Sequence, residues 1–171
     1  MPRRRRLTEL GARIGAIGIG ASLAACGPAG PTEPLPSVTL AELRSVDVGE
    51  LAAAPAAERF VGADLRRGEK LFRQCVVCHA IEPGVTIGQG PSLNGVWGRA
   101  SAAVPGFAYS SALAAADIKW SVRAMDAWVA QPLRLVPGSQ MSFGGLHAKR
   151  DRNDLLAYML ADERFWDEAE R

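Results

Sequence analysis

Two cysteines and a histidine stand together in the segment Cys75-Val76-Val77-Cys78-His79. This C-x-x-C-H spacing is typical of c-type haem attachment. Thiols three positions apart share one face of a helical turn, so each can form a thioether with one vinyl group of the same haem. His79 then supplies one axial nitrogen, and the second axial ligand decides between electron transfer and ligand chemistry. The sequence therefore predicts one covalent haem c, and the sixth iron ligand becomes the functional question.

Two other uses of the motif stay open on these residues alone. A structural zinc site needs four ligands, and outside the motif the chain offers only Cys26 and His147. A thioredoxin-like redox pair is expected within a βαβ pattern, whereas the residues around the motif follow helix and loop patterns. Both observations favour haem attachment.

The candidate sixth ligand is Met141, which follows the turn Pro137-Gly138. It lies 62 residues beyond His79, the difference between 141 and 79. Methionine is often core filler, so it is the Pro-Gly turn that favours a ligand here. A P-G-x-x-M-x-F segment at this distance resembles that of the class I cytochromes c, the group of mitochondrial cytochrome c and its bacterial relatives.

The resemblance covers roughly residues 61–165, and a second segment keeps its register. Gly90-Pro91-Ser92-Leu93 is similar to the G-P-x-L turn of the family. The resemblance implies that the Pro91 carbonyl accepts the Nδ1 proton of His79. Such a bond fixes the tautomer and the orientation of a ligating histidine.

Three more residues, Arg99, Tyr109 and Trp120, fall at family positions that hydrogen-bond the haem propionates. Without the family, Arg99 is a solvated loop charge and the two aromatic residues are ordinary core residues. The resemblance implies that His79 and Met141 bind the iron within a larger cofactor-binding set, namely Cys75, Cys78, His79, Met141, Pro91, Arg99, Tyr109 and Trp120.

The chain departs from the family pattern in two respects. Trp128 stands where many relatives have a tyrosine whose hydroxyl reaches the ligating methionine, so that bond is not expected here. The ring of lysines around the haem edge is largely replaced by uncharged residues, namely Gln74, Gly88, Leu133 and Gln140. We therefore expect docking to depend less on positive charge than it does in the family.

The N-terminus resembles a bacterial lipoprotein signal peptide. Four arginines from Arg3 to Arg6 precede a short apolar stretch, and Leu23-Ala24-Ala25-Cys26 resembles a lipoprotein processing site. The apolar stretch holds about a dozen residues, whereas a bilayer span needs roughly 20, and small residues end it as in signal peptides. Residues 1–25 are predicted to be removed and Cys26 to be lipidated, with an uncleaved membrane anchor as the alternative.

Charge gives no support to nucleic-acid binding. The whole chain has 20 basic and 18 acidic residues, and the first 25 residues hold five of the arginines and one glutamate. The remainder has 15 basic and 17 acidic residues, a net charge of about −2. The arginines from Arg3 to Arg6 are better interpreted as a signal for membrane topology than as a nucleic-acid-binding patch.

Composition favours one small domain with attachments. The chain has 171 residues, 48% of them hydrophobic and 22% charged, which fits one globular unit. Residues 26–60 are rich in proline and alanine and are predicted to be a tether. Within this tether, residues 39–46 fit one or two amphipathic turns with Leu40 and Leu43 on one side. Residues 61–171 form the predicted haem domain, whose core the haem completes.

Apolar spacing and helix-breaking residues predict an all-α domain of about five helices and loops, in agreement with the class I cytochrome c fold. Asp64 and Ser121 are the predicted N-caps, and Pro132 follows the end of the second capped helix. The resemblance implies that the last helix crosses the first near Gly68, where glycine permits close approach. The helices are expected at residues 64–75, 109–115, 122–130 and 150–166.

These observations predict an electron carrier of a bacterial respiratory or photosynthetic chain and not an enzyme. We expect a monomer, anchored by lipid on the periplasmic side of a membrane. Its expected partners are membrane redox complexes such as a bc1-type complex, a terminal oxidase or a reaction centre. A haem peroxidase or gas sensor with a labile sixth ligand, and the cytochrome subunit of a dehydrogenase, are the alternatives.

Overall fold

The computed structural model describes residues 38–44, 59–83, 85 and 87–167. Contacts divide the chain into the units Met1–Gly30 and Pro31–Arg171, and every described residue belongs to the second unit. The predicted signal segment and Cys26 therefore lie outside the described residues. Among the described helices, none is long and apolar enough to cross a membrane.

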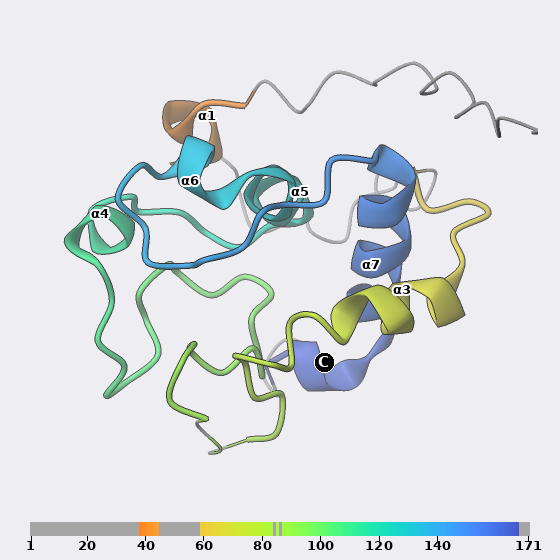
Figure 1. Cartoon of the computed structure of the whole chain (residues 1–171), viewed down its shortest axis with the longest axis horizontal. Coiled ribbons are helices and arrows are strands. Elements are labelled where there is room, and N and C mark those ends of the chain that lie inside the picture. The colour runs from red at the N-terminus through yellow and green to blue at the C-terminus, as the bar shows by residue number, and fades with distance from the viewer. Residues whose placement is uncertain (1–37, 45–58, 84, 86, 168–171) are drawn as a thin grey trace, which may run out of the picture. The chain divides into compact units, whose positions relative to one another are not determined.

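Helices and loops make up the described part of the chain (Figure 1), which confirms the predicted all-α class. A single isolated β-bridge joins Ala100 to Lys119. The described residues contain no β-strand. The elements in chain order are α1 (Leu40–Arg44), α3 (Leu65–Phe72), α4 (Ser111–Ala114), α5 (Val122–Ala130), α6 (Pro132–Leu135), α7 (Lys149–Ala161) and the short 3-10 helix η2 (Glu163–Phe165).

The two predicted N-caps are confirmed. The Asp64 carboxylate accepts a hydrogen bond from the Arg67 amide at 3.1 Å, and α3 begins directly after Asp64, at Leu65. The Ser121 hydroxyl accepts from the Ala124 amide at 3.1 Å and begins α5. Each cap satisfies an amide that has no partner within its helix.

Helix ends differ more from the predictions than helix starts do. Helix α3 ends at Phe72 and not at Cys75, because tighter turns follow it, with the Cys75 amide donating to the Phe72 carbonyl at 2.7 Å. Helix α7 ends at Ala161, where Asp162 takes extended dihedral angles and caps η2. The short helix α6 was not predicted, although proline is well suited to a first helical position.

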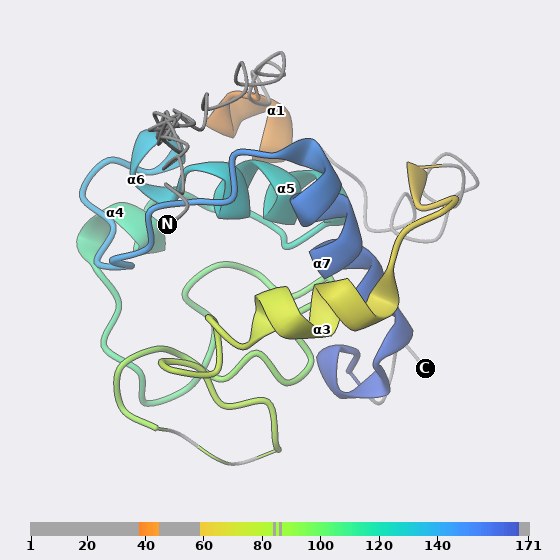
Figure 2. The ribbon, with the colours of Figure 1, turned by 45° about the vertical axis from the view of Figure 1, so that its right-hand side comes forward.

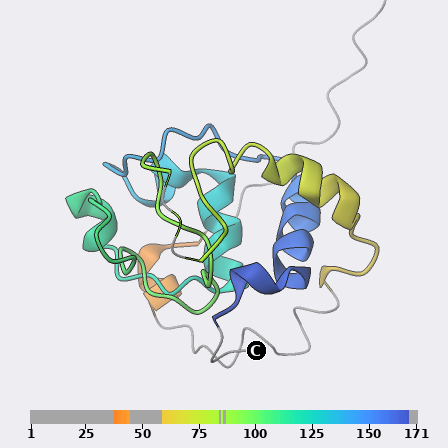
Figure 3. The ribbon, with the colours of Figure 1, turned by 90° about the horizontal axis from the view of Figure 1, so that it is seen from below.

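Helices α3 and α7 cross in close contact on one side of the domain (Figures 1, 2 and 3). Gly68 lies at the crossing, where an added Cβ atom would be 2.0 Å from the Asp154 carbonyl oxygen. The Asp154 carboxylate accepts from the Asp64 amide at 2.9 Å and from Arg67 Nη1 at 2.9 Å. The crossing thus combines main-chain contact with a nearly buried carboxylate that binds both the N-cap and the first turn of α3.

Helix α1 belongs to the folded domain although it lies within the predicted tether. Leu43 is fully buried in the same apolar core as the residues of α5 and α7. Thr39 and Glu42 form a capping box, in which the Thr39 amide donates to Glu42 at 2.7 Å and the Glu42 amide donates to Thr39 at 3.3 Å. The predicted amphipathic turn is thus present, with Leu40 also packed against the core.

We expect Gly68→Ala to lower the free energy of unfolding by at least about 2 kcal/mol, because main-chain atoms at the crossing cannot move aside cheaply. Guanidinium unfolding of the haem-loaded protein measures the change. Gly144→Ala is the matched control, since an added Cβ there meets nothing within 4 Å. Equal stability of the two variants would contradict the assigned role of the crossing.

Candidate functional site

An apolar cavity of about 290 Å³ lies inside the domain. Helix α5 contributes Met125, Trp128 and Val129, which share one face of the helix because their spacing is three and four residues. Helix α7 contributes Leu155 and Met159. Most of the wall is apolar, and the few polar groups come from loops, which is the usual construction of a cofactor pocket.

The cavity brings together every predicted haem-site residue that the structure describes. These residues belong to the long segment between α3 and α4, to the short segment between α4 and α5, and to the loop between α6 and α7 (Figure 1). They are Cys75, Cys78, His79, Pro91, Arg99, Tyr109, Trp120 and Met141. His147 is exposed and is not part of the cavity wall.

The His79 ring is held by the Pro91 carbonyl. Nδ1 lies 2.7 Å from the Pro91 oxygen, and because a carbonyl only accepts, Nδ1 must carry the proton. Burial lowers the pKa of His79, while the bond to Pro91 acts in the opposite direction. The partly buried ring is therefore set up as a neutral imidazole whose Nε2 lone pair is free to bind a metal.

Both cysteines of the motif are free thiols in the cavity wall. Burial, and secondarily the neighbouring Cys78, raises the pKa of the Cys75 thiol to about 11. Cys78 Sγ donates to the Gln89 side chain at 3.3 Å. The His79 amide donates to the Cys75 carbonyl at 2.9 Å, so one tight turn presents two thiols and an imidazole to the same space.

Arg99 is fixed by main-chain carbonyls. Its guanidinium donates to Asn94 and to Ser92, each at 2.7 Å. Burial lowers the pKa of Arg99, and the charges of Tyr109 and Asp167 act in the opposite direction. Two neutral carbonyls orient the Arg99 guanidinium without cancelling its charge. This part of the cavity wall is therefore suited to binding a carboxylate of a bound group.

Two aromatic residues complete the polar side of the cavity. The Tyr109 hydroxyl accepts from the Val104 amide at 3.3 Å, and burial raises its pKa. Trp120 is buried and packs against Trp128 with ring centroids 5.5 Å apart. Both residues therefore lie in the wall of the same cavity, and their contact with haem propionates stays a prediction.

The loop that carries Met141 is anchored at both ends. The Ser139 amide donates to the Val136 carbonyl at 3.1 Å, which closes the Pro-Gly turn, and the Met141 amide donates to the Ser139 hydroxyl at 3.3 Å. Gly145 has a positive φ of 94°, and an added Cβ would lie 2.1 Å from the Ala130 carbonyl oxygen. Hydrogen bonds thus fix the start of this loop, and close main-chain packing against Ala130 holds its end.

The sequence interpretation missed two further methionines of the cavity wall, Met125 and Met159. Met159 was expected only as a core residue of the last helix. Met125 falls on the same helical face as Trp128 and Val129, and this spacing was the one signal that could have identified it.

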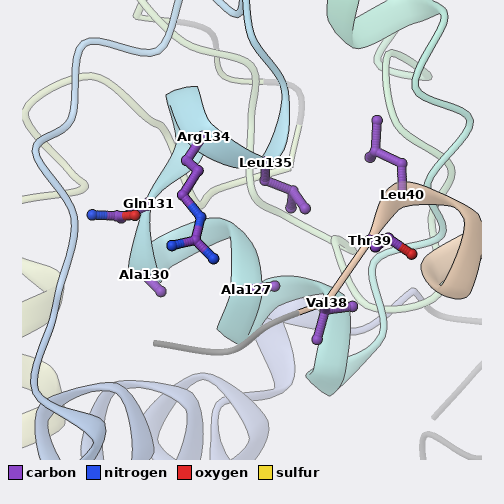
Figure 4. Close-up of a pocket in the computed structure, with 8 residues that line it drawn as sticks. All are labelled: Val38, Thr39, Leu40, Ala127, Ala130, Gln131, Arg134 and Leu135. Atoms are coloured by element: carbon purple, nitrogen blue, oxygen red, sulfur yellow. The ribbon is translucent and has the colours of Figure 1, made fainter. Parts of the chain in front are cut away.

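A second cavity of about 220 Å³ lies beside α1 (Figure 4). Val38 and Leu40 line one side, and residues of α5 and α6 line the other, with Arg134 as its charged residue. It contains no cysteine, histidine or carboxylate in its wall. Nothing in this wall offers the chemistry that the larger cavity contains.

Comparison with known proteins identifies the class to which this chain belongs. It is 37% identical over 99 residues to "Cytochrome c" of Gibberella zeae, a match that covers 57% of this chain and 93% of the relative. It is 44% identical over 97 residues to "Cytochrome c" of Euglena viridis, covering 56% and 94%. It is 39% identical over 108 residues to "Cytochrome c2" of Blastochloris viridis, covering 63% and 82%. No protein-family model matches the chain.

The chain therefore belongs to the class I c-type cytochromes. It is an electron carrier and not an enzyme, and its cofactor is one covalent haem c. The cavity fits that cofactor, since it offers two thiols, a neutral imidazole and a thioether within mostly apolar walls.

We expect Gly90→Ala to reduce haem incorporation, because the added Cβ would lie 2.7 Å from His79 Cε1 and 3.0 Å from the Cys78 carbonyl oxygen. The ring would have to tilt away from Pro91, at a cost of about 1–3 kcal/mol. The ratio of haem absorbance to protein absorbance measures the loss. Gly144→Ala serves again as the control, and an unchanged ratio in Gly90→Ala would disprove the tight fit.

Proposed function

We propose that His79 and Met141 are the two axial ligands of the haem iron and that Cys75 and Cys78 attach the porphyrin. The observation that supports this is the convergence of all four residues on one cavity, although His79 and Met141 lie 62 positions apart in the chain. The C-x-x-C-H turn and the Met141 loop approach this cavity from different elements, one after α3 and one after α6.

When bound, haem c supplies an iron that accepts and releases one electron. The residues of this chain set the conditions for that change. His79 presents Nε2 with its ring held by Pro91, and a soft thioether from Met141 favours the reduced metal and so raises the potential. Arg99 supplies positive charge for a propionate, in the orientation that Ser92 and Asn94 give it.

The mouth of the cavity favours docking through an uncharged surface. Gln74 and Gln140, at two of the family's lysine positions, line the cavity, and Leu133 at a third is 53% exposed. Two aliphatic residues of the attachment motif are also exposed, Val76 at 41% and Val77 at 69%. A partner that binds here would gain from apolar contact more than from charge.

We place this carrier in a bacterial respiratory or photosynthetic chain, held by lipidated Cys26 on the periplasmic side of a membrane. Relatives named "Cytochrome c2" in Blastochloris viridis and Rhodoblastus acidophilus support the bacterial setting. The partners we propose are a bc1-type complex, a terminal oxidase or a reaction centre. If the chain is instead a dehydrogenase subunit, purification from membranes will recover that enzyme with it.

We expect the oxidised wild-type protein to have the weak red charge-transfer band of thioether-bound ferric haem, and Met141→Ala to abolish it. Nitrogen or water in the sixth position does not produce this band. The absorption spectrum of the ferric holoprotein is the measurement, and Met125→Leu is the control, because Met125 also lines the cavity. A band that survives Met141→Ala would sink the assignment.

We expect electron transfer with the membrane partner to depend weakly on salt and strongly on Cys26. Lysine-steered docking is screened steeply, since the Debye length is about 8 Å at physiological ionic strength. A tethered protein gains effective concentration instead.

The measurement is the rate of cytochrome oxidation or reduction in membranes across a range of ionic strength, for wild type and Cys26→Ser. A steep salt dependence in wild type would refute the uncharged docking surface. Full activity of a released Cys26→Ser protein at cellular concentration would refute the tether.

A further inference from the structure

A buried ion pair joins α5 to α7 beside the Met141 loop. Asp126 is 8% exposed and Arg152 is 2% exposed. Arg152 Nε donates to Asp126 Oδ1 at 2.8 Å. Arg59 Nη2 lies 2.8 Å from the same oxygen, so one carboxylate serves two cations.

The other edge of the Arg152 guanidinium holds the end of the loop. Nη1 donates to the Leu146 carbonyl at 3.0 Å and to the His147 carbonyl at 2.7 Å. The Leu146 amide donates to the Val129 carbonyl of α5 at 2.8 Å. The last residues of the loop are therefore bound by one side chain from α7 and by the main chain of α5.

Asp126 decides whether Arg152 can keep this position. Burying a guanidinium is costly unless a carboxylate pairs with it, and removing one partner of a buried pair leaves an uncompensated charge. Without the Asp126 charge, Arg152 and Arg59 would be two cations facing one neutral group. Arg152 would then gain by turning toward water, and the carbonyls of Leu146 and His147 would lose their donor.

We propose that Asp126 is a positioning residue for the sixth iron ligand: acting through Arg152, it holds the end of the Met141 loop and keeps Met141 on the iron. This inference rests on the proposed ligation by Met141. Asp126 is not among the residues that line the cavity, and its effect passes through Arg152 to the main chain of residues 146 and 147.

The consequence concerns external ligands of the haem iron. A small base such as imidazole can bind only when Met141 has left, so its apparent affinity is its intrinsic affinity multiplied by the fraction of open loops. Weakening the anchor raises that fraction. It leaves the intrinsic affinity unchanged, because the open site is the same in every variant.

The experiment is a titration of the ferric holoprotein with imidazole, followed by loss of the red thioether band. We expect Asp126→Asn to bind imidazole about tenfold more tightly than wild type, because the open fraction rises by that factor. Asp151→Asn is the matched control. It removes the same charge one residue from Arg152, but the ion pair that it breaks joins α7 to Arg67 of α3 and not to the Met141 loop.

The free energy of unfolding distinguishes a specific effect on the Met141 loop from a general loss of stability. Guanidinium unfolding is measured for both variants, and Asp126→Asn must bind imidazole more tightly even where the two lose similar stability. Equal imidazole affinities in the two variants, with the band present in wild type, would overturn this inference alone. Absence of the band in wild type would overturn the Met141 ligation and this inference with it.

Should Asp126→Asn give no holoprotein, Arg152→Lys answers the same question. Lysine keeps the positive charge but lacks the fork that joins Asp126 to two carbonyls. We expect the same tighter binding of imidazole, and an affinity equal to that of Asp151→Asn would count against the proposal.

Discussion

The close crossing of α3 and α7 is the constraint on which the haem cavity depends. Because Gly68 has no side chain, the main chains of the two helices meet there. Asp154 then binds the amide of the N-cap Asp64 and the guanidinium of Arg67, which fixes where α3 begins. The turn with both thiols and the imidazole follows α3 directly, and α7 supplies the apolar wall that faces the same space. A change in the crossing would therefore move the attachment residues relative to that wall.

The cavity combines apolar walls with polar groups that are already bound to the protein. His79 is bonded to Pro91, Arg99 to two carbonyls and Tyr109 to a main-chain amide. These bonds restrict the rotamers of the side chains that line the cavity. Polar groups that are already oriented need not reorganise when charge develops beside them.

Helix α5 has two roles in this structure. One face closes the cavity with Met125, Trp128 and Val129. Its main chain and its Asp126 carboxylate also hold the end of the Met141 loop, directly through Val129 and indirectly through Arg152. The helix that forms part of the cavity wall therefore also holds the end of the Met141 loop.

The local features of this protein could be predicted from its amino-acid sequence. The C-x-x-C-H motif, the caps at Asp64 and Ser121 and the bounds of α5 depend on neighbours within a few positions, so pattern and chemistry predict them. Gly68 instead meets Asp154, far along the chain, and its place at the crossing was implied by the family resemblance. The contact between His79 and Pro91 spans only 12 residues and was likewise implied by the family resemblance.

The contacts that join distant segments could not be predicted in this way, because they depend on the tertiary structure. The Asp126 and Arg152 pair spans 26 positions, and nothing in either residue's surroundings marks it as buried. The burial of Leu43 within a proline-rich segment and the placement of His147 outside the cavity are of the same kind. Such features depend on how whole helices pack, because burial and ion pairing are set by partners that the chain brings together only on folding.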